Sequence, residues 1–154
     1  MKRSAALAPA AYPFRSNAPG LKATKPLRSK PQPKANEDQL ARWERMRAIG
    51  CIACLQNVRF GLAPAPLNFD NRLEIQHHLS GRRRRGHDDT VCLCTLHHQG
   101  NRLPDPSMGY KAHARLYGPS FGKEPSRFRE MYGNEDAQLA YQERLLAGES
   151  VTHA

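Results

Sequence analysis

The sequence predicts a small α+β domain that is stabilised by zinc and preceded by a disordered basic tail. Three observations support this prediction: a proline-rich, acid-free N-terminal segment, a strand–turn–strand–helix pattern in residues 72–100, and four cysteines in two close pairs. With 154 residues, of which 39% are hydrophobic, the chain can form one core of modest size. Small domains bury a limited share of their surface and often need a metal ion or disulfides for stability.

Residues 1–36 form the predicted tail. They contain eight basic residues, six prolines and no acidic residue, so most of the net charge of +10 lies in this segment. Such a segment buries too little apolar surface to offset the entropy of ordering it, and we expect it to be disordered. Its charge indicates a polyanionic partner, with a purely solubilising role as the alternative. The tail residues expected to contact nucleic acid are Lys22, Lys25, Arg28, Lys30 and Lys34.

The folded domain is expected over residues 37–148, followed by a short C-terminal tail at 149–154. The apolar stretch Ala5–Ala11 is short and contains Pro9, which makes it a poor signal peptide. No apolar run is long enough to span a membrane. We therefore expect a monomer in a reducing cytoplasm, where clustered cysteines bind metal more often than they form disulfides. A disulfide-bonded secreted protein is the alternative.

A capped helix is predicted over residues 37–49. Asn36 is a typical N-cap, Gln39 stands at the capping-box position and Gly50 is a natural stop. Apolar residues recur at helical spacing along this segment, namely Leu40, Trp43, Met46 and Ile49. The helix leads directly to Cys51–Cys54, which we interpret as a zinc-knuckle turn.

The pattern after the knuckle predicts a ββα unit and then three further helices. Its expected elements are a loop at 55–71, a strand at 72–79, a basic turn at 80–86, a strand at 90–93 and a short helix at 95–100. The later helices are expected at 108–117, 126–132 and, after the cap Asn134, up to about 147. The inner face of the last helix is expected to contain Leu139, Leu145 and Leu146.

Two paired motifs indicate a structural zinc site. They are Cys51-x-x-Cys54 and Cys94-x-x-His97, which together supply the four soft or borderline ligands of a zinc tetrahedron. In a core this small, the zinc would also contribute folding free energy. Cys92 is the competitor of Cys94, although the spacing of Cys94 to His97 fits a knuckle better. Free buried thiols are the alternative to the whole site.

His77, His78 and His98 form a second group of candidate residues. Neighbours on a strand point to opposite faces, so His77 can bind a metal while His78 faces a different group. We expect His77 and His98 to hold a catalytic divalent ion. His78 would act as a general base, because the pKa of histidine lies near neutrality. The alternative is that all these histidines serve one or two structural zinc ions.

The basic turn between the two strands is a candidate for phosphate binding. Its guanidinium groups could pair with phosphates on either side of the scissile bond, and they are Arg82, Arg83, Arg84 and Arg85. A solvated run of charge is the alternative. No helix suited to reading bases is evident, so we expect little base specificity, and the tail would add salt-dependent affinity.

These motifs resemble the ββα-metal finger of HNH endonucleases, and within them the phage Ref proteins (recombination enhancement function), a family of RecA-dependent nucleases. The resemblance covers residues 48–146 and is carried by Ile75–Leu79, Gly86–Cys94, Leu96–His98, Tyr117–Phe121 and Phe128–Gly133. It implies a metal-dependent DNA endonuclease in a bacterial or phage-infected cell. It also implies that a RecA filament targets the enzyme to DNA.

The resemblance also implies roles for single residues. His77 and His98 match the metal ligands of HNH enzymes, and His78 matches the general base. The central asparagine of the motif is missing, and Asp88 is the preferred substitute, with His87 and Asp89 as alternatives. The catalytic ion is expected to be Mg²⁺ or Mn²⁺, with Zn²⁺ as an alternative, and its third ligand is Asp105, His113 or water. The rival function is a non-catalytic zinc module that binds nucleic acid.

Overall fold

The computed structural model describes residues 33–65, 72–80, 83–101 and 105–149. The chain divides into two units, Met1–Pro33 and Lys34–Ala154, and the second unit contains every described helix and strand. The predicted disorder of the tail concerns residues outside the described ranges, apart from its last few positions. The elements are, in order, α1 Glu37–Ile49, α2 Ile52–Phe60, β1 Leu73–His77, β2 Leu79–Ser80, β3 Arg83–Arg84, β4 Thr90–Cys94, α3 Thr95–Gln99, α4 Tyr110–Tyr117, α5 Pro125–Tyr132 and α6 Glu135–Leu146.

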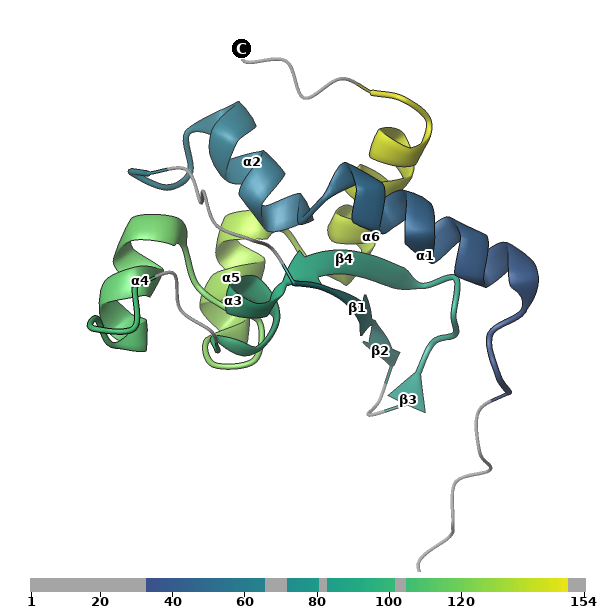
Figure 1. The fold of residues 1–154 in the computed structure, drawn as a ribbon, viewed down its shortest axis with the longest axis horizontal. Coiled ribbons are helices and arrows are strands. Elements are labelled where there is room, and N and C mark those ends of the chain that lie inside the picture. Colours follow the sequence, from purple (N-terminus) through teal and green to yellow (C-terminus); the bar gives the residue numbers. More distant parts are fainter. Residues whose placement is uncertain (1–32, 66–71, 81–82, 102–104, 150–154) are drawn as a thin grey trace, which may run out of the picture. The chain divides into compact units, whose positions relative to one another are not determined.

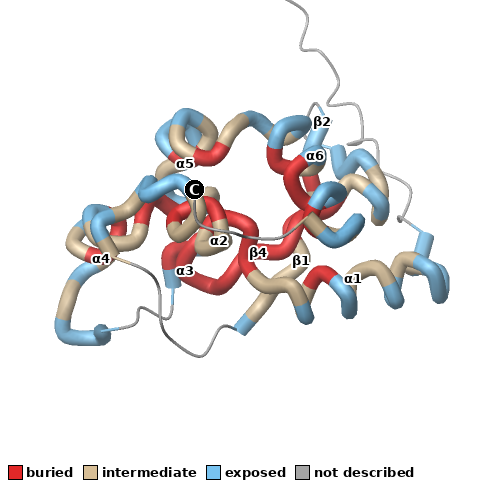
Figure 2. The backbone as a smooth tube through the Cα atoms, turned by 90° about the horizontal axis from the view of Figure 1, so that it is seen from above, coloured by how far each residue is buried: buried red, intermediate tan, exposed pale blue. Residues whose placement is uncertain are grey.

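The antiparallel pair of β1 and β4 lies at the centre of this unit. Leu73 is opposite Cys94 and His77 is opposite Thr90, so the predicted ββ hairpin is confirmed. Every residue of β4 is buried, and Figure 2 shows this strand as a continuous buried segment among the helices. The α+β fold class predicted from the sequence is therefore correct.

Helix α1 begins and ends where the sequence predicts. Asn36 accepts a hydrogen bond from the backbone N–H of Gln39, and the Gln39 side chain accepts one from the N–H of Asn36, which completes the capping box. The helix is attached to β4 through polar contacts, because Arg42 and Trp43 both donate to the hydroxyl of Thr90. The indole N–H of Trp43 also donates to the backbone carbonyl of His87, which fixes the loop before β4.

Helix α2 occupies residues 55–60, the first part of the loop that was expected at 55–71. Cys51 is its N-cap, and Gly61 ends it in the left-handed conformation, with φ of 60°. Its buried residues follow helical spacing and are Ile52, Ala53, Gln56 and Asn57. The segment Cys51–Cys54, which was expected as a knuckle turn, is thus the first turn of α2. Two of the buried residues of α2, Gln56 and Asn57, are polar, so the helix shows no clear amphipathic pattern in the sequence.

The basic turn after β1 is partly a second antiparallel pair. Leu79 is opposite Arg84 and Ser80 is opposite Arg83, while residues 81 and 82 lie outside the described ranges. All four residues of these two strands are exposed. Figure 1 shows β2 and β3 extending from the end of β1, at the opposite end of the sheet from α3.

Helices α3, α4 and α5 gather near the C-terminal end of β4, whereas α1 and α6 lie along the strand (Figure 1). Two backbone bonds tie the loop after α4 to α3, from Phe121 N–H to the His97 carbonyl and from Gly122 N–H to the His98 carbonyl. The helix expected at 108–117 begins at Tyr110, and the one expected at 126–132 begins at Pro125.

Helix α6 packs against β4 with a face that the sequence pattern did not predict. Of the three leucines expected on its inner face, only Leu145 is buried, whereas Leu139 and Leu146 are half-buried. The buried face also contains Gln138, Tyr141 and Gln142. Gln142 is there because its side chain accepts the backbone N–H of Cys92 at 3.0 Å, which satisfies a donor on the free edge of β4.

The hydrophobic core joins both cysteine motifs to the helices. It contains Leu93 and Leu96 beside the aromatic rings of Phe128, Tyr132 and Tyr141. Glu149 was assigned to the C-terminal tail, but it forms ion pairs with Arg59 and Arg144. Among the described residues, no helix has the length and apolar character needed to cross a membrane.

Candidate functional site

Three cysteines and one histidine form a compact cluster under α2 and α3. Its members are Cys51, Cys54, Cys94 and His97, and one ligand atom from each lies within 4.8 Å of the others. Cys51 and Cys54 belong to the first turn of α2, and Cys94 and His97 belong to the first turn of α3. The fold therefore brings together the two motifs that the sequence pairs, and the choice of Cys94 over Cys92 is confirmed.

The spacing of these atoms fits a zinc ion. The Nδ1 of His97 lies 3.5 Å from the sulfur of Cys51, 3.3 Å from that of Cys54 and 3.2 Å from that of Cys94. The sulfurs of Cys54 and Cys94 are 3.9 Å apart. In a tetrahedron with Zn–S bonds near 2.3 Å, neighbouring ligand atoms lie about 3.5–3.8 Å apart. The cluster could therefore hold zinc with little movement.

The protonation states of the cluster residues also favour the binding of a cation. Burial raises the pKa of the Cys51 thiol, but hydrogen bonds from Cys54 and Cys94 and the charge of His97 bring it well below its ordinary value. The hydrogen bond with Cys51 raises the pKa of both Cys54 and Cys94. Burial lowers the pKa of His97, but the charges and hydrogen bonds of Cys51 and Cys94 together outweigh burial and raise it to about 10. The metal-free cluster thus stabilises one thiolate, whereas a divalent cation would stabilise all three.

The other ring nitrogen of His97 is fixed by a hydrogen-bond network. Its Nε2 lies 2.9 Å from the carbonyl of Tyr117, and the same carbonyl accepts from the side chain of Asn57 at 2.7 Å. The hydroxyl of Tyr132 donates to Asn57 at 2.9 Å. An Nε2–H donor leaves the lone pair on Nδ1, the atom that faces the three sulfurs. Asn57 and Tyr132 support the cluster through these contacts, and sequence reasoning missed them because no motif marks them.

Cys92 is the remaining cysteine and lies outside the cluster. It is fully buried in the middle of β4, opposite Ile75. Burial raises the pKa of its thiol to about 12, so it stays protonated at neutral pH. All four cysteines are free of disulfides. Cys92 therefore behaves as a small core residue.

His77 lies beside His87 in a partly buried aromatic group. The Nε2 of His77 is 3.1 Å from the Nδ1 of His87, and Trp43 contacts both rings edge to face. Burial lowers the pKa of His77, and the charge of Arg84 lowers it further. At neutral pH this imidazole can therefore offer a lone pair to a cation. His87, one of the alternatives to the missing asparagine, is thus in direct contact with His77.

His78 is fully buried, and neither of its ring nitrogens makes a hydrogen bond of normal geometry among the described residues, although Gln138 lies close enough to its ring to raise its pKa. Its backbone N–H donates to the carbonyl of Asp89 at 3.0 Å, which fixes it next to the start of β4. Burial lowers the pKa of its imidazole, against the opposing charge of Glu135. The side chain is therefore a neutral imidazole at pH 7.

His98 lies at the other end of β1 and contacts a carboxylate. Its Nδ1 is 2.5 Å from the Oε2 of Glu74, which also accepts from Gln99 at 2.9 Å. Glu74 and His77 are three positions apart on β1, so their Cα atoms are about 10 Å apart and their side chains leave opposite faces. His77 and His98 thus make their contacts at separate places, and their binding of one ion stays a prediction. Glu74 is not part of any motif in the sequence, because its contact with His98 joins β1 to α3, 24 residues further along the chain.

The predicted acidic residues have contacts of their own. Asp88 accepts a hydrogen bond from Gln39 at 3.0 Å, at the N-terminus of α1. His113 accepts the N–H of Asp105 through Nε2, and its Nδ1 lies 3.2 Å from the Gly109 carbonyl. Both ring nitrogens of this histidine therefore hold the segment before α4. The proposed catalytic role of Asp88 and the third-ligand role of Asp105 or His113 remain predictions.

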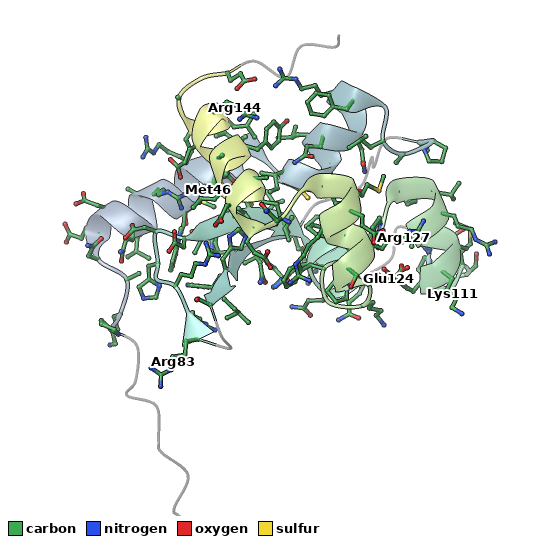
Figure 3. All side chains as sticks on the ribbon, turned by 180° about the vertical axis from the view of Figure 1, so that it is seen from behind. Met46, Arg83, Lys111, Glu124, Arg127 and Arg144 are labelled. Carbon is green, nitrogen blue, oxygen red and sulfur yellow. The ribbon has the colours of Figure 1, made fainter. Side chains whose placement is uncertain are left out.

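The arginines of the basic turn differ in their surroundings. Arg83 and Arg84 are exposed on β3, and Figure 3 shows Arg83 pointing away from the helices. Arg85 forms an ion pair with Asp136 at the start of α6. Arg82 and the tail residues Lys22, Lys25, Arg28 and Lys30 lie outside the described ranges.

Comparison with known proteins gives one match. A family model described as recombination enhancement, RecA-dependent nuclease matches residues 34–147. No curated protein and no solved structure matches the chain. The matched range includes the whole Cys51/Cys54/Cys94/His97 cluster and every histidine of the candidate site.

Proposed function

The chain belongs to the family of recombination-enhancement, RecA-dependent nucleases, and from this premise we propose that it is an HNH-type, metal-dependent endonuclease. It would hydrolyse phosphodiester bonds of DNA that a RecA filament has paired. The observation that carries this proposal is the family match over residues 34–147, which covers nearly all of the described domain. A zinc module that binds nucleic acid without cutting it is the alternative.

The zinc of the cysteine cluster would have a structural role. Its four protein ligands complete a tetrahedron, and three of them are almost fully buried. A catalytic zinc site keeps one position open for water or substrate, and a closed Cys₃His site does not. The cluster would therefore hold α2 and α3 against the end of β4, while the chemistry occurs at the other histidines.

A divalent cation bound at those histidines would polarise the phosphate and stabilise the leaving oxygen. We propose His77 as its ligand, since its imidazole is neutral at pH 7 and only partly buried. His98 is the second ligand implied by the HNH resemblance. The contact of 3.1 Å between His77 and His87 supports His87 as an additional candidate.

His78 is proposed as the general base. A buried imidazole whose nitrogens lack hydrogen bonds lowers the stability of the fold by about 1–3 kcal/mol. Such a cost is understandable if the free lone pair of His78 is needed for catalysis. A base must lie within hydrogen-bond reach of the attacking water. Because His78 is fully buried, this role requires that substrate binding opens a path to its ring.

The exposed guanidinium groups of Arg83 and Arg84 would bind phosphates beside the scissile bond. The charge of Arg84 also lowers the pKa of His77, so this part of the hairpin lies near the proposed ligand. The Arg85–Asp136 ion pair would hold the hairpin to α6 and leave the two preceding arginines for the substrate.

Cleavage of circular DNA with and without a RecA filament, in Mg²⁺ or Mn²⁺, tests the proposal. We expect RecA-dependent cleavage by the parent and at least a 100-fold loss in His78→Ala, with zinc content and folding unchanged. His77→Ala, His87→Ala and His98→Ala identify the ligands by their effect on the metal concentration needed for cleavage. His153→Ala, outside the family match, is the control. Full activity of His78→Ala would show that His78 is not the base, and no cleavage by the parent would favour the non-catalytic alternative.

A further inference from the structure

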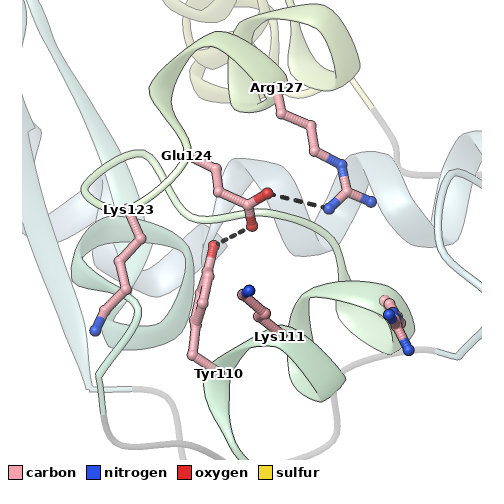
Figure 4. Close-up of a pocket in the computed structure, with 6 residues that line it drawn as sticks. Tyr110, Lys111, Lys123, Glu124 and Arg127 are labelled. Carbon is pink, nitrogen blue, oxygen red and sulfur yellow. Dashed lines mark hydrogen bonds and ion pairs between the residues drawn. The ribbon is translucent and has the colours of Figure 1, made fainter.

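A basic pocket lies between α4 and α5, away from the β2–β3 hairpin. It has a volume of about 380 Å³ and is lined by Tyr110, Lys111, Arg115, Lys123, Glu124 and Arg127. Figure 4 shows Lys111 reaching into it from α4 and Arg127 facing it from α5. In Figure 3, Lys111 and Arg127 lie on the opposite side of the domain from Arg83. The pocket is thus a separate surface from the basic turn.

The single acid of the pocket is already satisfied. The two oxygens of Glu124 accept from the hydroxyl of Tyr110 at 2.8 Å and from Arg127 at 3.2 Å (Figure 4). The Tyr110 hydroxyl in turn accepts the backbone N–H of Ser120 at 2.8 Å. The hydrogen bond from Tyr110 keeps the pKa of Glu124 below its ordinary value, so the acid stays ionised and orients Arg127. Three further cations line the pocket without an acidic partner among the described residues.

This excess of charge contrasts with most arginines of the described domain. Many of them are neutralised by ion pairs, namely Arg42, Arg47, Arg59, Arg85, Arg129 and Arg144. Lys111, Arg115 and Lys123 are exposed instead, and they converge on one hollow. Lys111 and Arg115 are spaced i, i+4 on one helix face, which places their Cβ atoms about 5–6 Å apart. Lys123 lies over the ring of Tyr110, with its ammonium 5.4 Å from the ring centre.

The pocket borders the segment that carries a proposed metal ligand. The backbone N–H of Gly122, next to Lys123, donates to the carbonyl of His98 at 2.8 Å. The side chain of Lys123 also covers Gly100 at the end of α3, where an added Cβ would lie 2.9 Å from its Cγ. A ligand held by Lys123 would therefore lie on the same side of the domain as α3.

We propose that this pocket binds a phosphate of the DNA backbone and forms a second contact surface for the polymer. The inference rests on the proposed function, since it extends the DNA path beyond the cutting site. The pocket holds four basic side chains against one carboxylate, Glu124, which is already paired with Tyr110 and Arg127. Lysine and arginine side chains in such excess are the donors that phosphate oxygens recognise. A contact at this distance from the β2–β3 hairpin would fix the orientation of the duplex rather than its sequence.

DNA binding by the full-length, zinc-loaded protein tests this proposal. Anisotropy of a labelled duplex is measured over a series of salt concentrations without added Mg²⁺ or Mn²⁺, so that no cleavage interferes. Each phosphate contact contributes about 0.9 to the slope of log K against log salt concentration. We expect Lys111→Gln/Arg115→Gln to lower this slope by about 2 and the affinity by roughly tenfold or more. Arg45→Gln is the matched control, because Arg45 is exposed on α1 and has no acidic partner among the described residues.

Several outcomes would overturn the inference. One is an unchanged duplex affinity and salt slope in the double variant. Another is a loss of duplex affinity in Arg45→Gln that equals the loss per removed charge in the double variant. Normal DNA binding with loss of RecA-dependent cleavage would assign the pocket to a protein contact. Competition by inorganic phosphate at low millimolar concentration, with unchanged duplex affinity in the variant, would assign it to a free anion. If the parent never cleaves DNA but the double variant still loses affinity, the nuclease proposal fails and the phosphate site stands.

Discussion

The carboxylate of Glu74 lies 2.5 Å from the Nδ1 of His98 and joins β1 to α3. With Nδ1 occupied by this contact, Nε2 is the nitrogen of His98 that can offer a lone pair to a cation. Gln99 donates to the same carboxylate oxygen and holds it in place. The pair therefore has the form of a ligand histidine and the carboxylate that orients it.

Glu74→Gln should weaken the proposed catalytic site without unfolding the domain. We expect a 10- to 100-fold rise in the Mn²⁺ concentration needed for half-maximal cleavage, because the ligand loses its orienting charge. Glu130→Gln is the matched control, since Glu130 is exposed on α5. An equal Mn²⁺ requirement in the parent and Glu74→Gln would remove this positioning role, whatever the effect on stability.

Cys54→Ser should remove the structural metal. The loss of one of four ligands weakens zinc binding, which is coupled to folding, so the midpoint of thermal unfolding should fall by more than ~10 °C. Zinc content by elemental analysis and unfolding followed by circular dichroism measure both effects. Cys92→Ala should retain zinc and lose only about 1 kcal/mol of stability, because Cys92 lies outside the cluster. Equal zinc content in both variants would contradict the site.

Gly118→Ala should destabilise the domain by about 1–3 kcal/mol. Gly118 has φ of 95°, and a Cβ there would lie 1.9 Å from the hydroxyl of Tyr132, which belongs to the network behind His97. Gly109→Ala is the control, since it has space for a Cβ and an ordinary φ of −71°. Urea denaturation of both variants provides the comparison, and equal stability of the two would mean that the Tyr132 contact is not tight in solution.

His78 should make the domain less stable in mild acid. Burial lowers its pKa in the folded state below the value of about 6.5 in an unfolded chain. The contribution of the neutral His78 side chain to the free energy of unfolding is therefore fully present above pH 6.5 and is lost as the pH falls through the folded-state pKa. Unfolding of zinc-loaded protein between pH 5 and 7.5 should show a smaller loss of stability in His78→Gln than in the parent. Lys111→Gln, which removes an exposed charge from α4, should follow the parent. Parallel curves for His78→Gln and the parent would contradict the shift.

Removal of residues 1–33 should weaken DNA binding without affecting the fold. The deletion keeps Asn36, so the capping box of α1 remains intact. The lost lysines and arginines should lower duplex affinity and the salt dependence of binding, because they are expected to contact phosphates. An identical salt slope before and after deletion would mean that the tail serves only solubility.

Local signals in the sequence were sufficient for several elements. Asn36 and Gln39 form the predicted capping box, because both of its hydrogen bonds join residues three apart. The spacing of Cys94 to His97 similarly describes one helical turn, and the structure confirms it. Such features depend on neighbours in the chain and are legible without knowing the rest of the fold.

Other elements depend on partners that are distant in the sequence. The part of α2 at 55–60 was expected as a loop, and its inner face includes Gln56 and Asn57, whose burial depends on contacts across the domain. Asn57 donates to the carbonyl of Tyr117, sixty residues further along the chain. Gln142 likewise lies on the inner face of α6, where leucines were expected, because its side chain accepts the backbone N–H of Cys92 at the edge of β4. The sequence does not indicate which polar residues will be buried and hydrogen-bonded in the folded protein.

The sequence by itself determined the members of the Cys₃His cluster, the order of the ββα elements and the nuclease family, because these follow from residue types at fixed short spacings. Only the tertiary structure decided which groups each histidine meets: His77 lies with His87, His98 lies with Glu74, and His78 is enclosed. The basic pocket between α4 and α5 is also a tertiary feature. The reason is physical: the packing of helices around β4 sets the distance between side chains that the chain itself keeps far apart.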